Sequence, residues 1–367
     1  MSGLKLVFVI YTLQKGGAER VLSTLGNSFS ERAYEVVIVC MNDAEQGYPL
    51  AEGIRVIPLL KRKYKQNVFR RLIYGMLTYF RLLGVLLREK PYCVISFMTS
   101  ANLWTGLSCG LLKIPYIVSE RTTPDHTINR FNFFFKWMSY FVYSGSKAVV
   151  VPAKGIEACL KNNGIFNRLT NYSIIRNPVY VFKSKEHLIV HHRKFILGVG
   201  RLSYEKGFDQ LIDAFSKLRI KNIDLIIVGQ GLEKPNLTAQ INRLNLQDRV
   251  ILAGAKDDLQ DYYNQAELFV LPSRNEGYPN ALIEAMSSGC PCVAVDCEFG
   301  PSEIIEDGQN GILVPQGNIP AMTKAMFNVL FDLSLKKKLG NEARLIGQTN
   351  SLEVISDKWE ALILSPA

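Results

Sequence analysis

Short apolar runs alternate with helical segments along this chain, and the whole pattern begins again near residue 195. Each run is short and continuous, which is typical of strands buried in a parallel sheet. The first series lies at 6–11, 36–41, 94–97, 116–119 and 148–151. The second series lies at 195–200, 224–228, 250–253, 268–271 and 292–295. Two successive β-α-β series predict an α/β protein with two doubly wound, Rossmann-like parallel sheets.

A polar stretch at 177–194 separates the two series and predicts a linker. The chain of 367 residues is long enough for two domains. We therefore expect an N-terminal domain over 1–180 and a C-terminal domain over 181–345. The last segment, 346–367, has helical spacing around Trp359 and is expected to pack back on the first domain.

The cysteines favour neither a metal site nor a disulfide framework. Seven are scattered along the chain, and Cys290 and Cys292 have no second pair or histidine at ligand spacing. Reduced thiols in a cytoplasmic protein are the better interpretation. The apolar run at 4–13 leads into Gly16 without a cleavage site, so we expect no signal peptide. No Asp-x-Asp follows a strand, and we expect no metal cofactor.

Two carboxylates, Glu276 and Glu284, stand eight positions apart in the segment 273–286. An apolar run ends at Pro272 before them, and Pro279 suits the first position of a helix. The free N–H groups and positive dipole end of that helix predict a phosphate site beside Glu276. The pair could then bracket a sugar on one side and a ribose on the other. Two glutamates with no shared task are the alternative interpretation.

A second pattern opens the C-terminal domain directly after its first strand. Arg201 and Lys206, between Gly200 and Gly207, lie where ligands bind in open α/β sheets. Two cations there would neutralise a diphosphate as it leaves. A dinucleotide fingerprint would need a third glycine that is absent here. Two solvated surface cations are the alternative.

Together these patterns resemble retaining glycosyltransferase family 4. The spacing of Glu276 and Glu284 is similar to the family's E-x7-E motif, in which the first Glu binds the donor sugar and the second the nucleotide ribose. Arg201 and Lys206 are similar to its diphosphate site. The resemblance implies the GT-B fold, with two Rossmann-like domains facing a cleft. It also implies that Glu276, Arg201 and Lys206 are the catalytic residues.

The resemblance implies further contacts to the donor. In the Glu276 loop these are Gly277, Tyr278, Pro279, Asn280 and Ala281. Elsewhere they are Gly16, Gly17, Gly229 and Lys256, each after a predicted strand. Glycine permits close backbone approach to a phosphate or sugar. A plain turn is the alternative for the glycine pair and for Lys256.

Arg121 departs from the family pattern. Many members, including bacterial transferases that act on lipid-linked N-glycan precursors, carry a histidine there. An arginine does not exchange a proton near neutral pH, so an acid–base role fails at this position. We expect Arg121 to bind a phosphate or hydroxyl of the acceptor.

Positive charge is concentrated in the first half. Residues 1–180 hold 23 Lys and Arg against 10 Asp and Glu, whereas residues 181–367 hold 20 against 23. Nine of the cations lie at 61–90 beside one acid, Glu89. This half therefore faces a negatively charged partner. We assign to the acceptor, or to the membrane that carries it, the four cations Arg62, Lys63, Arg70 and Arg71.

The stretch at 61–90 also resembles a basic amphipathic helix on an anionic membrane surface. Its apolar side recurs through Tyr64, Val68, Leu72, Tyr79, Leu82, Leu83 and Leu86. The apolar window is too short to span a bilayer. A solvated basic face is the alternative. Aromatic residues at 131–141 are better interpreted as a core helix, and nothing indicates base stacking or groove reading, so no nucleic-acid partner is expected.

The resemblance thus implies a retaining, metal-independent transferase with a nucleotide-sugar donor, expected to be a UDP-sugar, which is a substrate and not a cofactor. The expected acceptor is a polyprenyl-diphosphate-linked glycan of cell-surface polysaccharide synthesis, at the inner face of the membrane. A transferase with a free acceptor and a non-catalytic nucleotide-sugar binding protein are alternatives. A GT-B epimerase is disfavoured because the carboxylates and histidines of such sites are absent.

Overall fold

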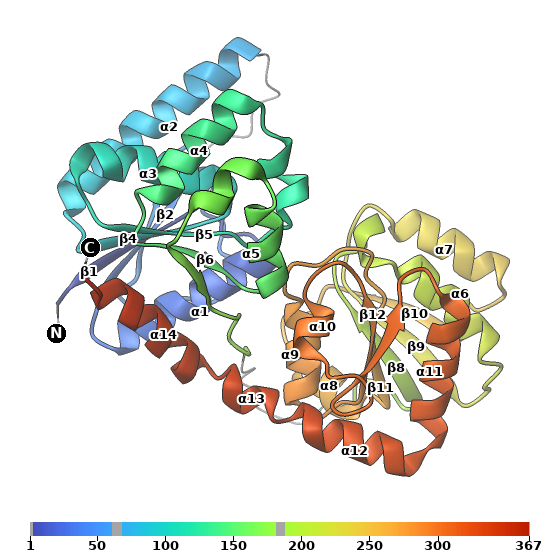
Figure 1. Ribbon diagram of the computed structural model, residues 1–367. Helices are drawn as coiled ribbons and strands as arrows, with labels where there is room; N and C mark the ends of the chain where they lie inside the picture. The colour runs from blue at the N-terminus through green and yellow to red at the C-terminus, as the bar shows by residue number, and fades with distance from the viewer. Residues whose placement is uncertain (1–2, 61–67, 181–187, 367) are drawn as a thin grey trace. The chain divides into compact units, whose positions relative to one another are not determined.

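The computed structural model describes residues 3–60, 68–180 and 188–366, and the chain divides into two compact units (Figure 1). Unit 1 comprises Met1–Pro178 and Leu352–Ala367, and unit 2 comprises Val179–Ser351. The boundaries expected from the sequence were 180 and 345. The chain stays in unit 2 beyond 345 because the short helix α13 (Ile346–Thr349) packs against α9 (Asn280–Ser287).

Unit 1 is built on a seven-stranded parallel sheet with the order β3-β2-β1-β4-β5-β6-β7. Its strands are β1 (Lys5–Ile10), β2 (Glu35–Cys40), β3 (Arg55–Pro58), β4 (Cys93–Phe97), β5 (Tyr116–Ser119), β6 (Ala148–Val151) and β7 (Tyr172–Ile174). Its main helices are α1 (Gly17–Glu31), α2 (Val68–Glu89), α3 (Thr99–Leu112), α4 (Phe133–Ser144), α5 (Lys154–Lys161) and α14 (Leu352–Leu364). Figure 1 shows α1 and α14 on one face of this sheet and α2, α3 and α4 on the other.

Helix α14 completes the core of unit 1. Ile355, Trp359 and Ile363 recur at helical spacing and are fully buried. The Trp359 ring stacks on Phe97 of β4 with 5.8 Å between ring centroids. At the same interface, the hydroxyls of Ser28 in α1 and Ser356 lie 2.8 Å apart. The last helix of the chain therefore belongs to the first unit.

Unit 2 is built on a six-stranded parallel sheet with the order β10-β9-β8-β11-β12-β13. Its strands are β8 (Lys194–Val199), β9 (Ile223–Val228), β10 (Val250–Gly254), β11 (Leu268–Leu271), β12 (Cys292–Asp296) and β13 (Ile312–Pro315). Its helices are α6 (Phe208–Lys217), α7 (Lys234–Arg243), α8 (Gln260–Gln265), α9, α10 (Pro301–Ile304), α11 (Ile319–Phe331), α12 (Leu333–Ala343) and α13. The predicted α/β class with two parallel sheets is confirmed.

The sequence patterns missed β3, β7 and β13. All three are strands of three or four residues that carry half-buried side chains. Strands β3, β7 and β13 each lie at the edge of a sheet, where one side of the strand has no partner. A continuous apolar run is expected only of a strand covered on both faces.

Candidate active site

The order of strands in unit 2 places a topological switch point between β8 and β11. From β8 the chain goes outward through β9 and β10, and then resumes on the other side with β11, β12 and β13. Connections that diverge in this way leave a crevice at the carboxyl ends of the two central strands. The loop 200–207 leaves β8 at this edge, and the loop 272–279 leaves β11 there.

Two of the predicted catalytic residues meet at this point. Lys206 Nζ lies 2.6 Å from Glu276 Oε1, and the Ser273 hydroxyl donates to the same oxygen at 2.7 Å. The Glu276 side chain is 8% exposed and the Lys206 side chain 28%. Burial makes the charge pair stronger than a surface pair. The structure thus brings a cation suited to a diphosphate against a carboxylate suited to sugar hydroxyls.

Close backbone packing holds these two loops together. Gly207 has φ +65°, and a Cβ at this position would lie 2.1 Å from the carbonyl oxygen of Pro272. Gly229, after β9, has φ +150°, and its Cβ would lie 1.8 Å from the carbonyl oxygen of Gly200. Only glycine permits both the dihedral angle and the approach. Gly229, which was predicted as a donor contact, therefore has a structural task in holding these loops together.

Arg274, which no sequence motif indicated, joins the two loops from the other side. Its guanidinium donates to both carboxylate oxygens of Asp209 at 2.8 and 2.6 Å, and it lies 4.1 Å from the centre of the Tyr204 ring. Its backbone N–H donates to the carbonyl oxygen of Glu205 at 2.7 Å. Tyr204 and Glu205 immediately precede Lys206, so Arg274 fixes the segment that carries the predicted catalytic lysine. A bidentate guanidinium–carboxylate pair is the most directional ion pair available to a protein.

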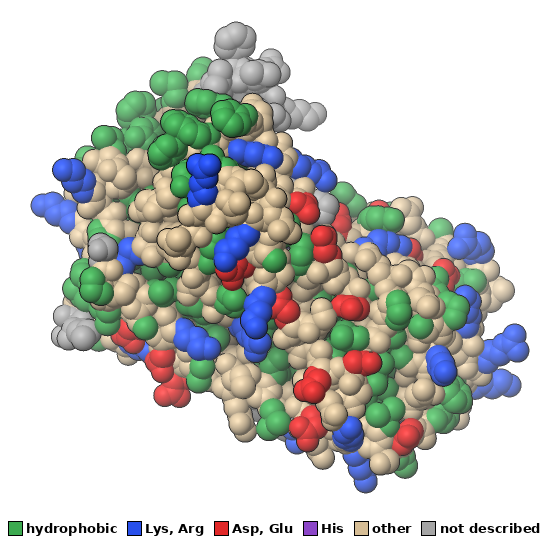
Figure 2. Space-filling view, in the orientation of Figure 1, with side chains coloured by type: hydrophobic (Ala, Val, Ile, Leu, Met, Phe, Trp, Pro, Cys, Tyr) green, Lys and Arg blue, Asp and Glu red, His purple; other side chains and the backbone are tan. Residues whose placement is uncertain are grey.

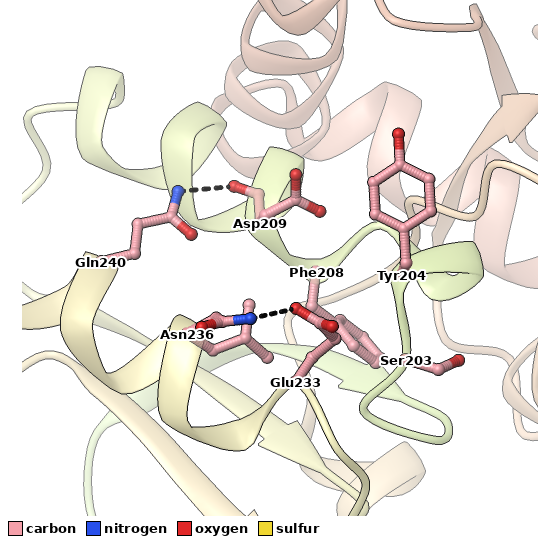
Figure 3. Close-up of a pocket in the computed structure, with 8 residues that line it drawn as sticks. Ser203, Tyr204, Phe208, Asp209, Glu233, Asn236 and Gln240 are labelled. Carbon is pink, nitrogen blue, oxygen red and sulfur yellow. Dashed lines mark hydrogen bonds between the residues drawn. The ribbon is translucent and has the colours of Figure 1, made fainter.

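A small pocket of about 100 Å³ lies beside this contact (Figure 3). Tyr204 and Asp209 line it together with Glu233, whose carboxylate accepts from Asn236 at 2.9 Å. Ligand pockets for molecules the size of a nucleotide sugar occupy roughly 300–1,000 Å³. The pocket in Figure 3 is too small and too acidic to be the donor site.

Glu284 lies one turn inside α9 and is 2% exposed. The Tyr263 hydroxyl of α8 donates to Glu284 Oε2 at 3.0 Å. Tyr263 was not predicted, and a tyrosine in a short helix twenty-one positions away gives no local signal. In the same segment, the buried Tyr278 hydroxyl accepts from Asn350 Nδ2 at 2.8 Å, which ties the Glu276 loop to the end of unit 2.

The other predicted donor residues of unit 2 surround this edge of the sheet. Pro279 is the N-cap of α9, so the helix begins one position later than predicted, and Asn280 and Ala281 open its first turn. Gly277 packs beneath Gly300, whose Cβ would lie 2.9 Å from the Gly277 carbonyl oxygen. Lys256 is exposed after β10, two strands from β8.

Arg201 is exposed in the 200–207 loop. The backbone N–H of Glu205 and the Ser203 hydroxyl hold the pKa of the Glu205 carboxyl below its usual value, and Arg201 and Lys206 lower it further. The segment thus concentrates positive potential, as a diphosphate site requires.

In unit 1, Gly16 is the N-cap of α1 and Gly17 its first residue. They follow β1, which is next to β4 at the switch point of this sheet. Glycine at a helix N-terminus beside a switch point is compatible with the predicted close approach to a ligand.

Arg121 follows β5 and is enclosed by groups that carry no negative charge. Its Nε donates to the Ser119 hydroxyl at 2.7 Å, and Nη1 donates to Asn177 Oδ1 at 2.5 Å. The guanidinium also lies over the rings of Phe97 and Trp359, at 5.1 and 5.7 Å. Burial lowers the pKa of Arg121 to about 9. Within the described part of the chain, its buried Nη2 has no hydrogen-bond acceptor.

The preceding residue, Glu120, is also buried, at 1% exposure. Thr99 and Asn102 donate to its carboxyl oxygens at 3.0 Å each, and the Tyr143 hydroxyl donates to Oε1. Burial raises the pKa of Glu120 although these donors lower it. No sequence motif indicated this network.

The basic stretch differs from its prediction. Arg62 and Lys63 lie outside the described residues. Arg70 and Arg71 belong to α2, but their side chains are not among those described. The prediction that the apolar side of this helix faces a membrane is wrong in part, because Leu82 and Leu86 are fully buried in unit 1. Helical spacing reveals an apolar face but does not say whether protein or lipid covers it.

The aromatic segment was also misassigned. It forms α4, and five of its aromatic side chains are exposed instead of packing in the core: Phe133, Phe134, Phe135, Trp137 and Phe141. Among the residues that the structure describes, no helix combines the length and hydropathy needed to cross a membrane. Nor do three His, Cys, Asp or Glu side chains gather there as metal ligands would. All seven cysteines are buried free thiols.

Comparison with known proteins extends these observations. The family described as Glycosyltransferase Family 4 matches residues 15–181, and the family described as Glycosyl transferases group 1 matches residues 181–346. The chain is 30% identical over 363 residues to the Campylobacter jejuni N-acetylgalactosamine-N,N'-diacetylbacillosaminyl-diphospho-undecaprenol 4-alpha-N-acetylgalactosaminyltransferase, covering 93% of this chain and 94% of the relative. It is 25% identical to the amylovoran biosynthesis glycosyltransferase AmsD of Erwinia amylovora, covering 98% of this chain and 99% of the relative.

Among solved structures, the Anabaena protein HepE in complex with UDP and glucose superimposes with a TM-score of 0.81. The identity is 18%, and the match covers 99% of this chain and 100% of that one. At this identity the likeness concerns the fold, which is the two-domain GT-B architecture.

Proposed function

The chain belongs to the glycosyltransferases, with domains of family 4 and group 1 in a GT-B fold, and from this premise we propose how it works. It moves a sugar from a UDP-sugar to an acceptor hydroxyl, with retention of anomeric configuration and without a metal ion. The donor binds to unit 2, at the carboxyl ends of β8 and β11. Glu276 binds the sugar hydroxyls and Glu284 the ribose.

The contact between Lys206 and Glu276 carries this proposal. A diphosphate that departs with two negative charges needs cations placed before the reaction starts. Lys206 and Arg201 provide them in the 200–207 loop. The carboxylate of Glu276 has no proton to donate when ionised, so it suits hydroxyl groups of a sugar that donate to it. The diphosphate and the sugar of a nucleotide sugar would thus bind to neighbouring side chains.

The relatives support a lipid-linked acceptor. The Campylobacter jejuni relative is named for transfer to a diphospho-undecaprenol-linked saccharide, and the Erwinia amylovora relative for amylovoran biosynthesis. We infer that this chain extends a polyprenyl-diphosphate-linked glycan of a surface polysaccharide, peripherally bound at the cytoplasmic face of the membrane. Arg121 and the cations of 61–90 would bind its phosphates.

The test begins with a thermal-shift screen of nucleotide sugars, because a bound donor raises the melting temperature by mass action. The donor that shifts most is then used for transfer to an undecaprenyl-diphosphate-linked saccharide in detergent, with and without EDTA. NMR of the product gives the anomeric configuration. Glu276→Ala should lower turnover by at least about 100-fold, whereas Glu342→Ala, at an exposed position of α12, serves as the matched control.

Unchanged turnover in Glu276→Ala would remove the site assignment. An inverted product would overturn the retaining mechanism, and loss of activity in EDTA would overturn metal independence. Equal transfer to the same saccharide without its lipid would overturn the lipid-linked acceptor. Each part of the proposal therefore fails separately.

A further inference from the structure

Helices α2 and α4 expose an extended apolar surface on unit 1. Of the twenty-two large hydrophobic side chains that are exposed among the described residues, ten lie on these two helices, five on each. We call these ten side chains the α2–α4 surface. They are Ile73, Met76, Leu77, Phe80 and Leu87 of α2, and Phe133, Phe134, Phe135, Trp137 and Phe141 of α4. Single exposed hydrophobic residues are ordinary, but a cluster of this kind marks a site of interaction.

The exposed apolar side chains of α2 lie on a different side of the helix from the side chains that pack in the core. Ile73, Met76, Leu77 and Phe80 follow the spacing i, i+3, i+4 and i+7 and so share one side of the helix. The opposite side, which includes Leu82, is fully buried in unit 1. A surface helix normally presents charged or polar residues on its outer side. Helix α2 is apolar on both sides, so its outer side needs a second partner.

The two helices lie on the same side of unit 1, with α3 packed against both of them. The Tyr79 ring of α2 lies 6.0 Å from Trp104 of α3, and Val142 of α4 packs directly on Gly106 of α3. Figure 2 shows hydrophobic side chains gathered over the region where Figure 1 draws α2 and α4. The two sets therefore form one surface.

The exposed charged side chains of the helices α2, α3 and α4 are all cations. Helices α2, α3 and α4 contain a single acid, Glu89. Its side chain is 5% exposed and is held by Lys5 and Arg55 at 3.0 and 2.6 Å. The Arg88 side chain, in contrast, is 67% exposed, and Arg81 is exposed while its guanidinium donates to the Leu59 carbonyl oxygen. These helices thus present aromatic and aliphatic groups with cations and no exposed carboxylate.

We propose that the α2–α4 surface inserts into the interface of an anionic lipid bilayer. Aromatic rings bind at the boundary between headgroups and acyl chains, while cations bind the anionic headgroups. A second copy of the chain fits less well, because a symmetric contact would face these cations with themselves. This inference rests on the proposed function in one respect: a lipid-linked acceptor requires the enzyme to work at a membrane. It assigns the contact to apolar insertion through α4, where the sequence had indicated only a basic helix.

Vesicle flotation of the full chain tests the proposal. Vesicles of phosphatidylethanolamine and phosphatidylglycerol are compared with phosphatidylcholine at 0.1 and 0.5 M NaCl. The variant Phe133→Ser, Phe134→Ser, Phe141→Ser removes side chains that are 82%, 63% and 51% exposed. Its control, Phe327→Ser, Phe331→Ser, Leu333→Ser, removes side chains of unit 2 that are 48%, 56% and 68% exposed. The α4 variant should bind anionic vesicles at least about tenfold more weakly, and the control like the unmodified protein.

Tryptophan fluorescence separates insertion from surface attraction. Trp137 is 47% exposed, whereas Trp359 is fully buried. Lipids brominated in the acyl chains should quench the unmodified protein and the control, and Trp137→Phe should lose most of this quenching. Binding without quenching, or binding that vanishes at 0.5 M NaCl, would mean electrostatic attraction alone and would overturn insertion.

Two further outcomes decide against the proposal. Equal vesicle binding by the α4 variant would overturn it, as would a concentration-dependent dimer that the α4 variant abolishes. Transfer to the lipid-linked saccharide in detergent is measured in parallel on the same proteins. If transfer fails in every protein while insertion is observed, the proposed function fails and this inference stands. If transfer persists and no insertion is observed, this inference fails and the proposed function stands.

Discussion

Lys206 Nζ lies 2.6 Å from Glu276 Oε1, although the two residues are seventy positions apart in the chain. The lysine comes from the loop after β8 and the glutamate from the loop after β11. In the proposed function, a diphosphate at Lys206 would share the ammonium group with Glu276, because this group has three N–H donors. The diphosphate and the sugar of the donor would then be bound next to each other.

Replacing Lys206 by Met should weaken UDP-sugar binding. Hydrogen bonds to charged groups contribute roughly 1.5–3 kcal/mol, so the dissociation constant should rise about ten- to hundredfold. Isothermal titration with the UDP-sugar that emerges from the screen measures the change. Lys217→Met, at the exposed end of α6, is the control and should bind normally. An unchanged dissociation constant in Lys206→Met would exclude Lys206 from the diphosphate site.

Arg274 should affect the reaction indirectly. Its contacts with Asp209 and Tyr204 position the segment that carries Lys206. The guanidinium makes two hydrogen bonds to Asp209 and lies on the Tyr204 ring, two residues before Lys206. Arg274→Ala and Asp209→Ala should each lower kcat/KM roughly tenfold, and the double variant should be no worse than the poorer single one. Arg274→Lys should recover only part of the activity, because lysine cannot form the bidentate contact.

The control for this cycle is the exposed pair Lys161 and Glu157 of α5, 2.5 Å apart. Alanine at either of those positions should leave kcat/KM unchanged, since an exposed helix pair contributes little. Additive losses at Arg274 and Asp209 would show that the two side chains act independently. A fall in melting temperature without a change in kcat/KM would make their contact purely structural.

The predicted strands share one property: their apolar runs are continuous because helices cover both faces of each sheet. The edge strands β3 and β7 lack it, although β10, which also lies at an edge, was predicted. Arg55–Pro58 carries a charged residue and a proline, so its residues do not form such a run. Tertiary pairing defines such strands, and periodicity within the chain cannot detect them.

The residues of the candidate site also include some that the sequence could predict and some that it could not. Glu276, Glu284 and Lys206 were predictable because each belongs to a local motif. Arg274 and Tyr263 were not, because their partners are 65 and 21 positions away and become neighbours only in the folded sheet. The surroundings of a helix face could be predicted only in part. The spacing in α2 predicted an apolar side, but Leu82 proved to face the core while Phe80 faces outward.

Gly207→Ala should destabilise unit 2 and abolish donor binding. The new Cβ would meet the Pro272 carbonyl oxygen at 2.1 Å, and neither backbone segment can move without displacing its loop. The cost should exceed the roughly 1–2 kcal/mol of a left-handed residue alone. Gly317→Ala is the control, because Gly317 has φ +74° with open space around its Cβ position. Urea unfolding compares the two variants, and equal losses would contradict the predicted clash.

Glu120 and Glu89 should give unit 1 opposite dependences of stability on pH. Burial raises the pKa of Glu120, so the folded protein retains a proton that the unfolded chain releases above the ordinary glutamate pKa of 4.5. This group therefore costs stability as the pH rises through 4.5. Arg55, and then Lys5, lower the pKa of Glu89 to about 2. Glu89 therefore contributes stability above pH 4.5 that is lost as the pH falls toward 2.

Replacing each carboxyl by an amide removes its titration. Relative to the unmodified protein, Glu120→Gln should gain free energy of unfolding from pH 4 to pH 7, by at most about 1.4 kcal/mol per pH unit. Glu89→Gln should lack the free energy of unfolding that the unmodified protein gains from pH 2 to pH 4.5, by roughly 1.5–3 kcal/mol in total. Urea unfolding followed by tryptophan fluorescence measures both, because Trp104, Trp137 and Trp359 all belong to unit 1. Parallel pH profiles for the two variants would contradict the opposite environments that the structure gives these two glutamates.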